Sequence, residues 1–569
     1  MYLRQHSNMQ IAFINPPHAD WSLANNFTFL LMQSYYNRFG KYAGQVEWLE
    51  SPYKWNTYES YDEVAAEVIS ADVIMFSSYT WNYVICDEIS AKIKKEYPNK
   101  ILVLGGPHIG TNEPELLASR PQYDLICRPT KPGEPFMAEL IDQFIEKRMD
   151  PTYIPWELRS DIEVIHDISK EDYSVYEDHL EYITKLLDYS REHKMEPFIV
   201  LETTRGCPYK CVFCEWGGGI NTKIYKKSVD IVKRDINAMI KAGYRDAYLT
   251  DANFGAFLKR DFEIFEYAWN NRFNLTDIST MKSKDLPRRK ELIDKWFEIV
   301  DKHVKAPGST DGEDMWTETA FVSLVPTVSI QSSSDTAMKL ADRVDLNTYD
   351  KLKLSEYIND RCTEHGYPIP ALELILAMPG STIDDFYFEM EYIWNFKAFG
   401  SYRHDYMFLP DSRLNSPEYK KKHNIETVEV YSDIVDEHGS DNWNSLYKDK
   451  KSYFRTILSC FSFTKEEMYE MWFMNNACNY ILQKFYPPFE KKISPSVFTK
   501  AVYNIIIELD EWIDIYNEIK DIYDPNTTPK SIRQLGGKFR TDFINDVLEK
   551  NKIIIMSEVH GACQGSNSH

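Results

Sequence analysis

Short apolar runs alternate with helical segments along the first 150 or so residues, and this alternation restricts the fold more than any other feature. The strand candidates are Ile11 to Ile14, Val73 to Phe76, Ile101 to Leu104 and Leu125 to Cys127. Helical patterns such as Pro135 to Phe144 separate or follow them. This order predicts a parallel, doubly wound sheet of the Rossmann-like or flavodoxin-like kind. Ligands bind beyond the carboxyl ends of such strands, so the loops at Asn15, Ser77 and Gly105 are candidate binding loops.

A second alternation covers residues 196–400. Its strand candidates are Phe198 to Glu202, Ala247 to Thr250, Thr327 to Gln331 and Leu372 to Ala377, with helical patterns at Val229 to Ala242 and Ile383 to Phe396. This length and order predict a full or partial (β/α) barrel. Residues 151–195 are highly charged without a clear period and read as a linker or wrapping segment. Beyond residue 400 the strand pattern fades, so residues 401–569 are expected to be mainly helical, as at Lys465 to Lys484 and Ser496 to Lys520.

The composition argues against several other classes of protein. The 569 residues carry a formal net charge of −22, which argues against a nucleic-acid partner because phosphate binding needs a basic footprint. No run approaches the 18 apolar residues of a membrane span. The polar stretch Met1 to Gln10 does not resemble a secretory signal. Nine cysteines are too few for a disulfide scaffold, so a reducing, cytoplasmic location is expected.

Three of the nine cysteines fall within eight residues, at Cys207, Cys211 and Cys214. Three thiolates from one loop can hold three irons of a [4Fe–4S] cluster and leave the fourth iron open to a small chelating molecule. A zinc site is the alternative, but it usually takes four ligands in two paired motifs, and no second pair lies nearby. A redox CxxC pair does not explain the third cysteine. The spacing therefore favours the cluster.

The same segment resembles the radical S-adenosylmethionine (SAM) superfamily, whose signature is CxxxCxΦC with an aromatic at the position of Phe213. The resemblance extends from Phe198 to about Gly400. It implies SAM contacts at Phe213 and on three later loops, although the Gly-Gly-Glu usual in the family is absent. The implied contacts are Asp251 and Asn253 for the amino group, Ser329 and Gln331 for the carboxylate or ribose, and Met378 and Pro379 beside the adenine.

This resemblance also implies a chemistry. One electron, from an external donor such as flavodoxin or ferredoxin, cleaves SAM at the cluster into methionine and a 5′-deoxyadenosyl radical. That radical takes a hydrogen atom from an unreactive carbon. The cofactors carry the difficult step, while the protein positions the reacting atoms and excludes solvent.

The N-terminal loops resemble those of the cobalamin-binding domain found ahead of many radical SAM barrels. The residues that carry this resemblance are Asn15, Ser77, Ser78, Thr80, Gly105, Gly106, Pro107 and His108, followed by Arg128 and Gly133-Glu134. The Asp-x-His-x-x-Gly motif that supplies an axial histidine in classical methylcobalamin proteins is missing, and neither His18 nor His108 lies in that context. The alternative is a flavodoxin-like domain that serves as a structural cap without the cofactor.

Together these features lead to three functional hypotheses. The first is a cobalamin-dependent radical SAM enzyme that methylates an unactivated carbon of a peptide or natural-product intermediate. The second is a radical SAM peptide epimerase, or a ring-forming or rearranging enzyme, that transfers no methyl group and in which Cys362, Cys460 or another thiol returns hydrogen. Cys362 also suits an ordinary buried thiol. The third is a corrinoid or redox sensor without catalysis. The aromatic-rich C-terminal region is expected to close the barrel mouth over a peptide or small-molecule substrate.

Overall fold

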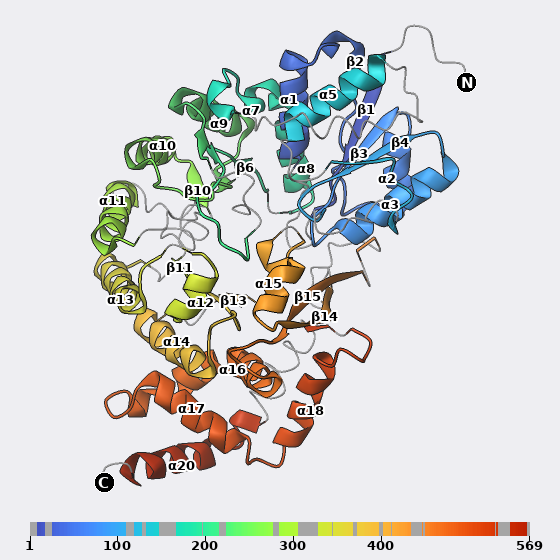
Figure 1. The fold of residues 1–569 in the computed structure, drawn as a ribbon. Coiled ribbons are helices and arrows are strands. Elements are labelled where there is room, and N and C mark those ends of the chain that lie inside the picture. Colours follow the sequence, from blue (N-terminus) through green and yellow to red (C-terminus); the bar gives the residue numbers. More distant parts are fainter. Residues whose placement is uncertain are drawn as a thin grey trace.

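The computed structural model describes most of the chain. The described residues are 8–17, 26–109, 119–127, 133–146, 167–195, 197–214, 223–276, 284–304, 328–343, 345–367, 372–397, 402–404, 406–410, 412–433, 446–447, 450–529, 531–532 and 547–565. Figure 1 shows an N-terminal α/β region, an arc of helices around the middle strands, and a helical C-terminal region.

The N-terminal region is built on a parallel five-stranded sheet in the order β2-β1-β3-β4-β5. Its strands are β1 (Met9–Ile14), β2 (Val46–Trp48), β3 (Val73–Ser77), β4 (Ile101–Gly105) and β5 (Leu125–Ile126). Helices α1 (Phe27–Phe39) and α5 (Gly133–Glu146) pack together, as do α2 (Tyr61–Val68) and α3 (Tyr83–Glu96).

Alternate strand residues enter two separate cores, one on each face of this sheet. Phe13 and Met75 pack in the core that holds α1 and α5 residues, whereas Ile14 and Phe76 pack in the core that holds α2 and α3 residues. Successive side chains of a strand point to opposite faces, so a sheet covered on both sides needs apolar residues at every position. The predicted doubly wound sheet is confirmed.

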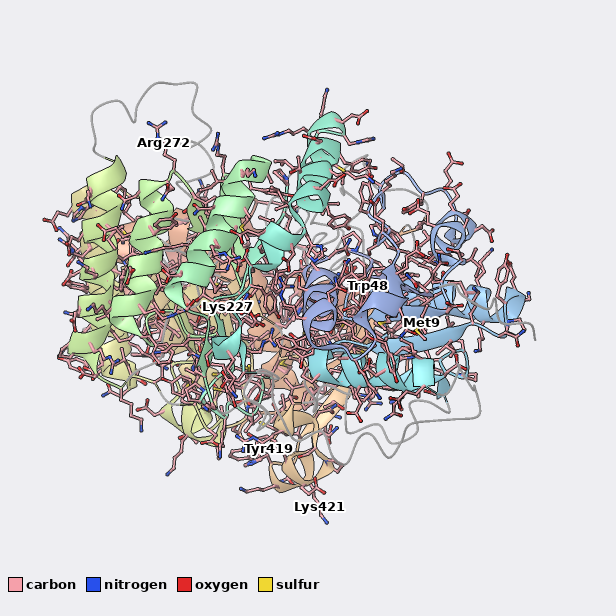
Figure 2. The ribbon with its side chains drawn as sticks, turned by 90° about the horizontal axis from the view of Figure 1, so that it is seen from above. Met9, Trp48, Lys227, Arg272, Tyr419 and Lys421 are labelled. Atoms are coloured by element: carbon pink, nitrogen blue, oxygen red, sulfur yellow. The ribbon has the colours of Figure 1, made fainter. Side chains whose placement is uncertain are left out.

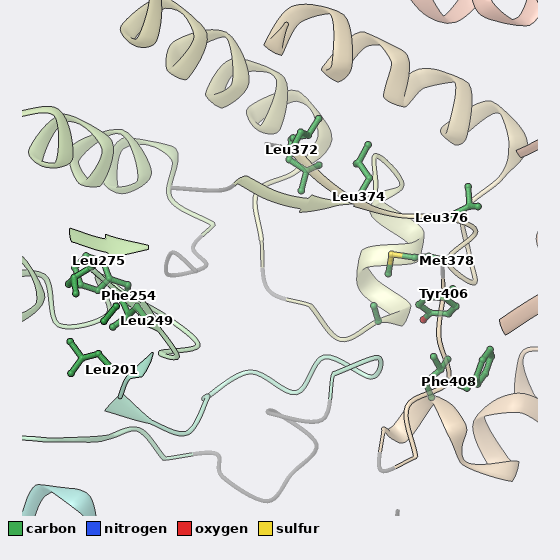
Figure 3. Close-up of a cluster of buried hydrophobic side chains, with 14 of the residues drawn as sticks. Leu201, Leu249, Phe254, Leu275, Leu372, Leu374, Leu376, Met378, Tyr406 and Phe408 are labelled. Carbon is green, nitrogen blue, oxygen red and sulfur yellow. The ribbon is translucent and has the colours of Figure 1, made fainter. Parts of the chain in front are cut away.

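The middle region contains two parallel three-stranded sheets, in the orders β10-β9-β6 and β11-β12-β13. The strands are β6 (Val200–Leu201), β9 (Asp246–Leu249), β10 (Asn274–Thr276), β11 (Val328–Gln331), β12 (Leu372–Ile375) and β13 (Tyr402–His404). Leucines of both sheets belong to one continuous core, which Figure 3 shows in part.

A single layer of helices covers both sheets. It consists of α9 (Val229–Ala242), α10 (Leu258–Asn270), α11 (Leu286–Val304), α13 (Thr348–His365) and α14 (Ile383–Phe396). Each helix packs on the next, including α11 on α13, where the layer passes from one sheet to the other. Figure 1 shows these helices as an arc around the strands. The described residues therefore form a partial (β/α) barrel whose strand ends share one edge.

Part of the predicted linker wraps the junction of the first two regions. It contains α7 (Val175–Asp178) and α8 (Leu180–Glu192). Both helices pack on α9, and α7 also packs on α1. The hydroxyl of Ser34 donates to Asp178 at 2.9 Å. The described part of this segment thus contacts both neighbouring regions.

The C-terminal region is mainly helical, with α15 (Pro417–Lys422), α16 (Lys465–Lys484), α17 (Pro495–Ile506), α18 (Trp512–Ile522) and α20 (Lys552–Gly565). It also contains an antiparallel hairpin of β14 (Glu426–Asp433) and β15 (Lys451–Ser459), which the sequence analysis missed. The hairpin reaches the N-terminal region, where the Tyr453 N–H donates to the Tyr83 hydroxyl at 3.2 Å. None of the described helices combines the length and apolarity that crossing a bilayer requires.

Candidate active site

The three clustered cysteines lie in one loop at the carboxyl edge of the barrel. This cluster loop, Cys207 to Cys214, follows β7 (Thr204–Arg205), which pairs with β8 (Tyr225–Lys226). Cys207 and Cys211 are buried and Cys214 is half-buried. Two backbone hydrogen bonds anchor the loop at Val212, whose N–H donates to the Ala341 carbonyl and whose carbonyl accepts from the Leu414 N–H, both at 2.9 Å.

Asp251 fixes the segment that leads into the cluster loop. Its carboxylate accepts from the backbone N–H groups of Thr203 and Thr204, each at 2.8 Å, and from the Thr203 hydroxyl. Burial raises the pKa of Asp251 to about 6, although these hydrogen bonds oppose the shift. The carboxylate is thus engaged with the chain itself, which favours a positioning role. Its assignment to the SAM amino group stays a prediction.

The cysteine thiols interact with one another and with two polar side chains. Burial raises the pKa of the Cys211 thiol, and the neighbouring Cys214 and Cys207 add to the shift, whereas the Arg343 guanidinium lowers that pKa. The Asn253 amide donates to Cys207 Sγ at 3.1 Å. Arg343 therefore favours the thiolate of Cys211, which is the form that ligates metal.

The donor chemistry of the loop fits an iron–sulfur cluster. Within the described ranges, no three His, Cys, Asp or Glu side chains are grouped so that they could hold one metal ion. A cubane cluster needs a different arrangement, because each thiolate binds its own iron. The separate but interacting thiols of Cys207, Cys211 and Cys214 suit that requirement.

The ends of β11 and β12 face the same edge of the barrel. Gln331 and Ala377 both have left-handed backbone conformations, with φ of 68° and 59°. Such angles are costly for residues other than glycine and concentrate at functional sites. Ser329 donates from its hydroxyl to Glu373, and its carbonyl accepts from Arg343 at 2.8 Å. Gln331 and Ser329 are both buried at this edge.

Gly380 closes the loop that contains Met378 and Pro379 against α12 (Asp335–Leu340). Its φ is 94°, and a Cβ atom there would lie 2.8 Å from Leu340 Cδ1 and 3.1 Å from the Ala337 backbone. The Ser334 hydroxyl donates to the Gly380 carbonyl at 3.0 Å. Met378 is buried, and Figure 3 shows it next to Tyr406. The predicted adenine contacts are thus fixed in place, and their role stays a prediction.

Tyr406 is a site residue that sequence reasoning missed. It lies just beyond β13, is almost fully buried, and its hydroxyl has no hydrogen-bond partner among the described residues. Burial raises its pKa, and the neighbouring Tyr419, Cys460 and Cys211 add to the shift. A buried phenol that has no partner among the described residues and is influenced by the charge of Cys211 fits a site that receives a polar group. An aromatic residue two positions after the last barrel strand was the available signal.

The predicted cobalamin residues gather at the carboxyl edge of the N-terminal sheet. The Asn82 amide ties two of the loops together by donating to the carbonyls of Pro16 at 2.8 Å and Ser77 at 3.2 Å. Gly106 has a φ of 107°, and a Cβ atom there would lie 2.3 Å from the Ser78 carbonyl oxygen. Asn15, Ser77 and Ser78 are buried, and Gly105, Gly106 and Thr80 are half-buried while Pro107 is exposed.

His108 is the histidine that the structure places at this edge. Its ring stacks on Tyr83 with centroids 4.1 Å apart, and its buried Nδ1 has no hydrogen-bond partner in the described part of the chain. Burial and nearby Arg120 lower its pKa to about 4, so the ring is neutral at pH 7. A neutral imidazole whose Nδ1 has no partner among the described residues suits contact with a large cofactor. His18 and Arg128 lie outside the described residues.

The two cysteines considered as hydrogen donors differ in their surroundings. Cys362 is fully buried within α13, in the layer outside the sheet, and burial raises its pKa to about 12. Cys460 lies at the end of β15, half-buried, with its sulfur 3.2 Å from the Ser462 hydroxyl. Cys460 is also the thiol that neighbours Tyr406. The burial of Cys362 favours an ordinary packing role.

Comparisons with known proteins find relatives in one class of enzymes. No protein-family profile matches the chain. The chain is 25% identical over 378 residues to the cobalamin-dependent radical SAM methyltransferase TokK of Streptomyces tokunonensis. It has the same identity over the same length to the 2-(S-pantetheinyl)-carbapenam-3-carboxylate methyltransferase of Streptantibioticus cattleyicolor. Each match covers 64% of this chain and 51% of the relative, so the chain spans about half of their length.

Solved structures extend the likeness to nearly the whole chain. The radical enzyme OxsB, with aqua-cobalamin and SAM bound, superposes with a TM-score of 0.55 at 12% identity and covers 97% of this chain and 79% of its own. The methyltransferase TsrM from Kitasatospora setae, with tryptophan and a SAM analogue bound, also gives 0.55 at 13% identity, covering 96% and 100%. The chain is similar to cobalamin-dependent radical SAM enzymes. This similarity confirms the fold class that the sequence predicts and the resemblance to cobalamin-dependent radical SAM enzymes.

Proposed function

We propose that this protein is a cobalamin-dependent radical SAM enzyme that methylates an unactivated carbon of a peptide or natural-product intermediate. The observation that carries the proposal is that one chain contains two candidate cofactor-binding edges, one on the barrel and one on the N-terminal sheet. The cluster loop lies at one edge and the Asn15–Ser77–His108 loops lie at the other. At each edge one buried polar atom, the Tyr406 hydroxyl or His108 Nδ1, has no hydrogen-bond partner among the described residues. The named relatives are methyltransferases, which favours methyl transfer over other radical chemistry.

Different residues of the chain would bind the cluster and SAM. Cys207, Cys211 and Cys214 would hold a [4Fe–4S] cluster, and the residues at the ends of β9, β11 and β12 would hold SAM beside it. When bound, the cluster would supply an electron and SAM a sulfonium that accepts it, and a bound corrinoid would supply a methyl carrier. Arg343 holds Cys211 toward its thiolate form, and Asp251 fixes the entrance of the loop. The sparse cysteines further favour a cytoplasmic location.

The N-terminal edge would hold the corrinoid. Asn15, Ser77, Ser78 and the Gly105–His108 loop would contact it, and glycine lets a backbone approach a ligand closely. The hairpin of β14 and β15 borders this edge, because the Ser452 hydroxyl donates to the Thr80 carbonyl. It also supports the barrel edge, because the Phe408 N–H donates to the Arg455 carbonyl at 3.0 Å. Substrate would therefore lie under the hairpin, between the two edges.

Anaerobic reconstitution with iron, sulfide and hydroxocobalamin tests the proposal. The purified protein is expected to bind the cluster and the corrinoid together, as measured by iron and sulfide content and by visible absorbance. Replacing Cys207, Cys211 and Cys214 with alanine is expected to abolish iron binding, whereas the matched Cys362→Ala and Cys478→Ala variants, which remove fully buried thiols, keep it. A wild-type protein that binds iron but no cobalamin would contradict the methylation proposal.

A second candidate is a radical SAM epimerase, and the position of Cys460 favours it. The charge of this thiol influences Tyr406 at the barrel edge, so the thiol lies close enough to that edge for us to propose that it returns a hydrogen atom to a substrate radical. Such an enzyme incorporates solvent deuterium at the inverted carbon and loses that incorporation in Cys460→Ala. Methylated product formed at an unchanged rate by Cys460→Ala would exclude this candidate.

A further inference from the structure

We propose that a basic face around the cluster loop is the docking surface for an acidic one-electron carrier protein. This inference rests on the proposed function, since it assigns the place where the electron enters. The face comes from the cluster loop, α12 and the segment η4 (Arg413–Asn415) to α15. Its cationic residues are Lys210, Lys339, Arg413, Lys420, Lys421 and Lys422.

The cations of this basic face are solvent-accessible. Lys210, Lys339, Arg413, Lys421 and Lys422 are exposed, and Lys420 is half-buried. Figure 2 shows α15 at the edge of the molecule with Lys421 pointing away from it. The chain as a whole carries a net charge of −22. A cluster of exposed cations on so acidic a protein produces a local field opposite in sign to that of the rest of the molecule.

Few carboxylates neutralise the basic face. Arg413 pairs with Asp342 at 2.9 Å, and this pair is solvent-exposed. The lysines of the face have no carboxylate within ion-pair distance in the described part of the chain, and Lys420 instead donates to Asn415 at 3.0 Å. Burial and the neighbouring Arg455 lower the pKa of Lys420, which marks a further cation beside the face. The lysines are thus available to carboxylates from another protein.

Direct contacts join the basic face to the backbone of the cluster loop. Lys210 lies between Cys207 and Cys211 in the sequence, and its carbonyl accepts from the Arg413 guanidinium. The Tyr419 hydroxyl donates to the Leu340 carbonyl at 3.2 Å, so α15 rests on α12. Through Val212, the cluster loop is hydrogen-bonded to Ala341 at the end of α12 and to Leu414 of η4. A protein bound to this face would lie directly over the loop that holds Cys211.

The electron balance of the step is simple. A reduced carrier, such as flavodoxin hydroquinone, gives up one electron and becomes the semiquinone, while the bound cluster is reduced by one electron. No bond is made or broken in this transfer. Complementary charge raises the encounter rate of the two proteins and orients them, and salt weakens both effects. An acidic carrier therefore suits this face better than a neutral one.

Charge reversal of Lys421 and Lys422 tests the inference. The double variant K421E/K422E of the reconstituted protein is compared with K491E/K492E, which makes the same charge change at an exposed pair in the C-terminal region. We expect the Kd for flavodoxin, measured by titration calorimetry, to rise roughly tenfold in the first variant and to stay unchanged in the second. K339E, on a different element, is expected to act in the same direction.

Two further measurements separate docking from damage to the fold. Stopped-flow reduction of the cluster by flavodoxin hydroquinone is expected to slow in K421E/K422E, whereas reduction by dithionite keeps its rate. Raising the salt concentration is expected to weaken flavodoxin binding to the wild type and to remove the difference between the variants.

The outcomes that would contradict the docking surface differ from those that would contradict the proposed function. Equal flavodoxin affinity in the wild type and K421E/K422E would overturn the inference, as would an equal loss of rate with both reductants. Binding of an oligonucleotide, rather than flavodoxin, through the same lysines would also overturn it. A wild-type protein that holds no cluster would contradict the proposed function instead.

Discussion

Two buried polar atoms mark the two edges at which cofactors are proposed to bind. The Tyr406 hydroxyl lies at the barrel edge, within electrostatic range of Cys211, and His108 Nδ1 lies at the edge of the N-terminal sheet. Leaving a buried polar atom unpaired costs about 1–3 kcal/mol. Such a cost is tolerated where a ligand later supplies the missing partner. Both atoms therefore favour the same interpretation, in which each edge is completed by a bound group.

His108 gives the first prediction, which concerns pH. Its pKa is lowered to about 4 in the folded protein, against roughly 6.5 in an unfolded chain. Below pH 6.5 the unfolded chain binds a proton that the folded protein does not, so stability falls as the pH drops from about 6.5 toward 4. The loss reaches up to about 3 kcal/mol. Urea unfolding of the wild type and His108→Phe, which keeps a ring on Tyr83, measures it.

The difference between the unfolding free energies of the two proteins at neutral pH is the reference for this prediction. His108→Phe is expected to lose less stability than the wild type between pH 6.5 and 4, because it lacks the titrating ring. Parallel pH profiles for the two proteins would show that His108 does not titrate abnormally.

At the scale of elements, the parallel strands that lie within apolar runs could be predicted, whereas β2, β10 and the antiparallel hairpin could not. The buried central strands of the N-terminal sheet are continuous apolar runs, because both of their faces are covered. Strands β2 and β10 have three residues each, too few to show a period. The hairpin was missed although Val428 and Val430 alternate with exposed Glu429 and half-buried Tyr431. That alternation was the signal for a strand with one covered face.

Among the candidate site residues, those with a recognisable local pattern could be predicted and those that depend on tertiary contacts could not. Cys207, Cys211 and Cys214 could be proposed because their spacing alone specifies the chemistry. Tyr406 could not, because its importance depends on burial beside a loop almost 200 residues earlier in the chain. Asp251 shows the opposite case: its position after β9 was predicted correctly, but its hydrogen bonds to Thr203 and Thr204 depend on tertiary contact.

The loop after β4 gives the second prediction. Gly106→Ala would force a Cβ atom into the Ser78 backbone at a φ of 107°. We expect a loss of roughly 1–3 kcal/mol in the free energy of unfolding from the backbone conformation alone. Gly44→Ala is the control, because a Cβ atom there meets nothing within 4 Å. Weaker cobalamin binding in Gly106→Ala only would accompany the loss, and equal stability of the two variants would contradict the account of this loop.

At the scale of the whole molecule, a buried ion-pair network joins the N-terminal region to the barrel. Arg205 lies two residues before Cys207 and pairs with Glu134 of α5 at 2.7 Å and with Glu202 at 2.8 Å. Nearby, the fully buried Lys227 lies 3.7 Å from Glu171 and 3.6 Å from Asp235. The orientation of the two proposed cofactor edges is thus tied to the base of the cluster loop.

Removal of Arg205 gives the third prediction. Arg205→Met leaves the buried carboxylate of Glu134 and the half-buried carboxylate of Glu202 without this cation, which is expected to cost roughly 3 kcal/mol. Arg234→Met breaks the exposed pair with Glu177 and is expected to change stability by less than about 1 kcal/mol. Urea unfolding followed by tryptophan fluorescence compares them. Equal effects would show that the Arg205 network does not hold the two regions together.

The most direct test of the central claim is the product analysis of one anaerobic reaction. The reconstituted protein is incubated with SAM, hydroxocobalamin and a strong reductant, and the mixture is analysed by mass spectrometry for two SAM-derived products. A methylating cobalamin-dependent radical SAM enzyme is expected to form both S-adenosylhomocysteine and 5′-deoxyadenosine, and neither in the variant that lacks Cys207, Cys211 and Cys214. 5′-Deoxyadenosine without S-adenosylhomocysteine would contradict methyl transfer, and the absence of both from the wild type would contradict the enzyme class.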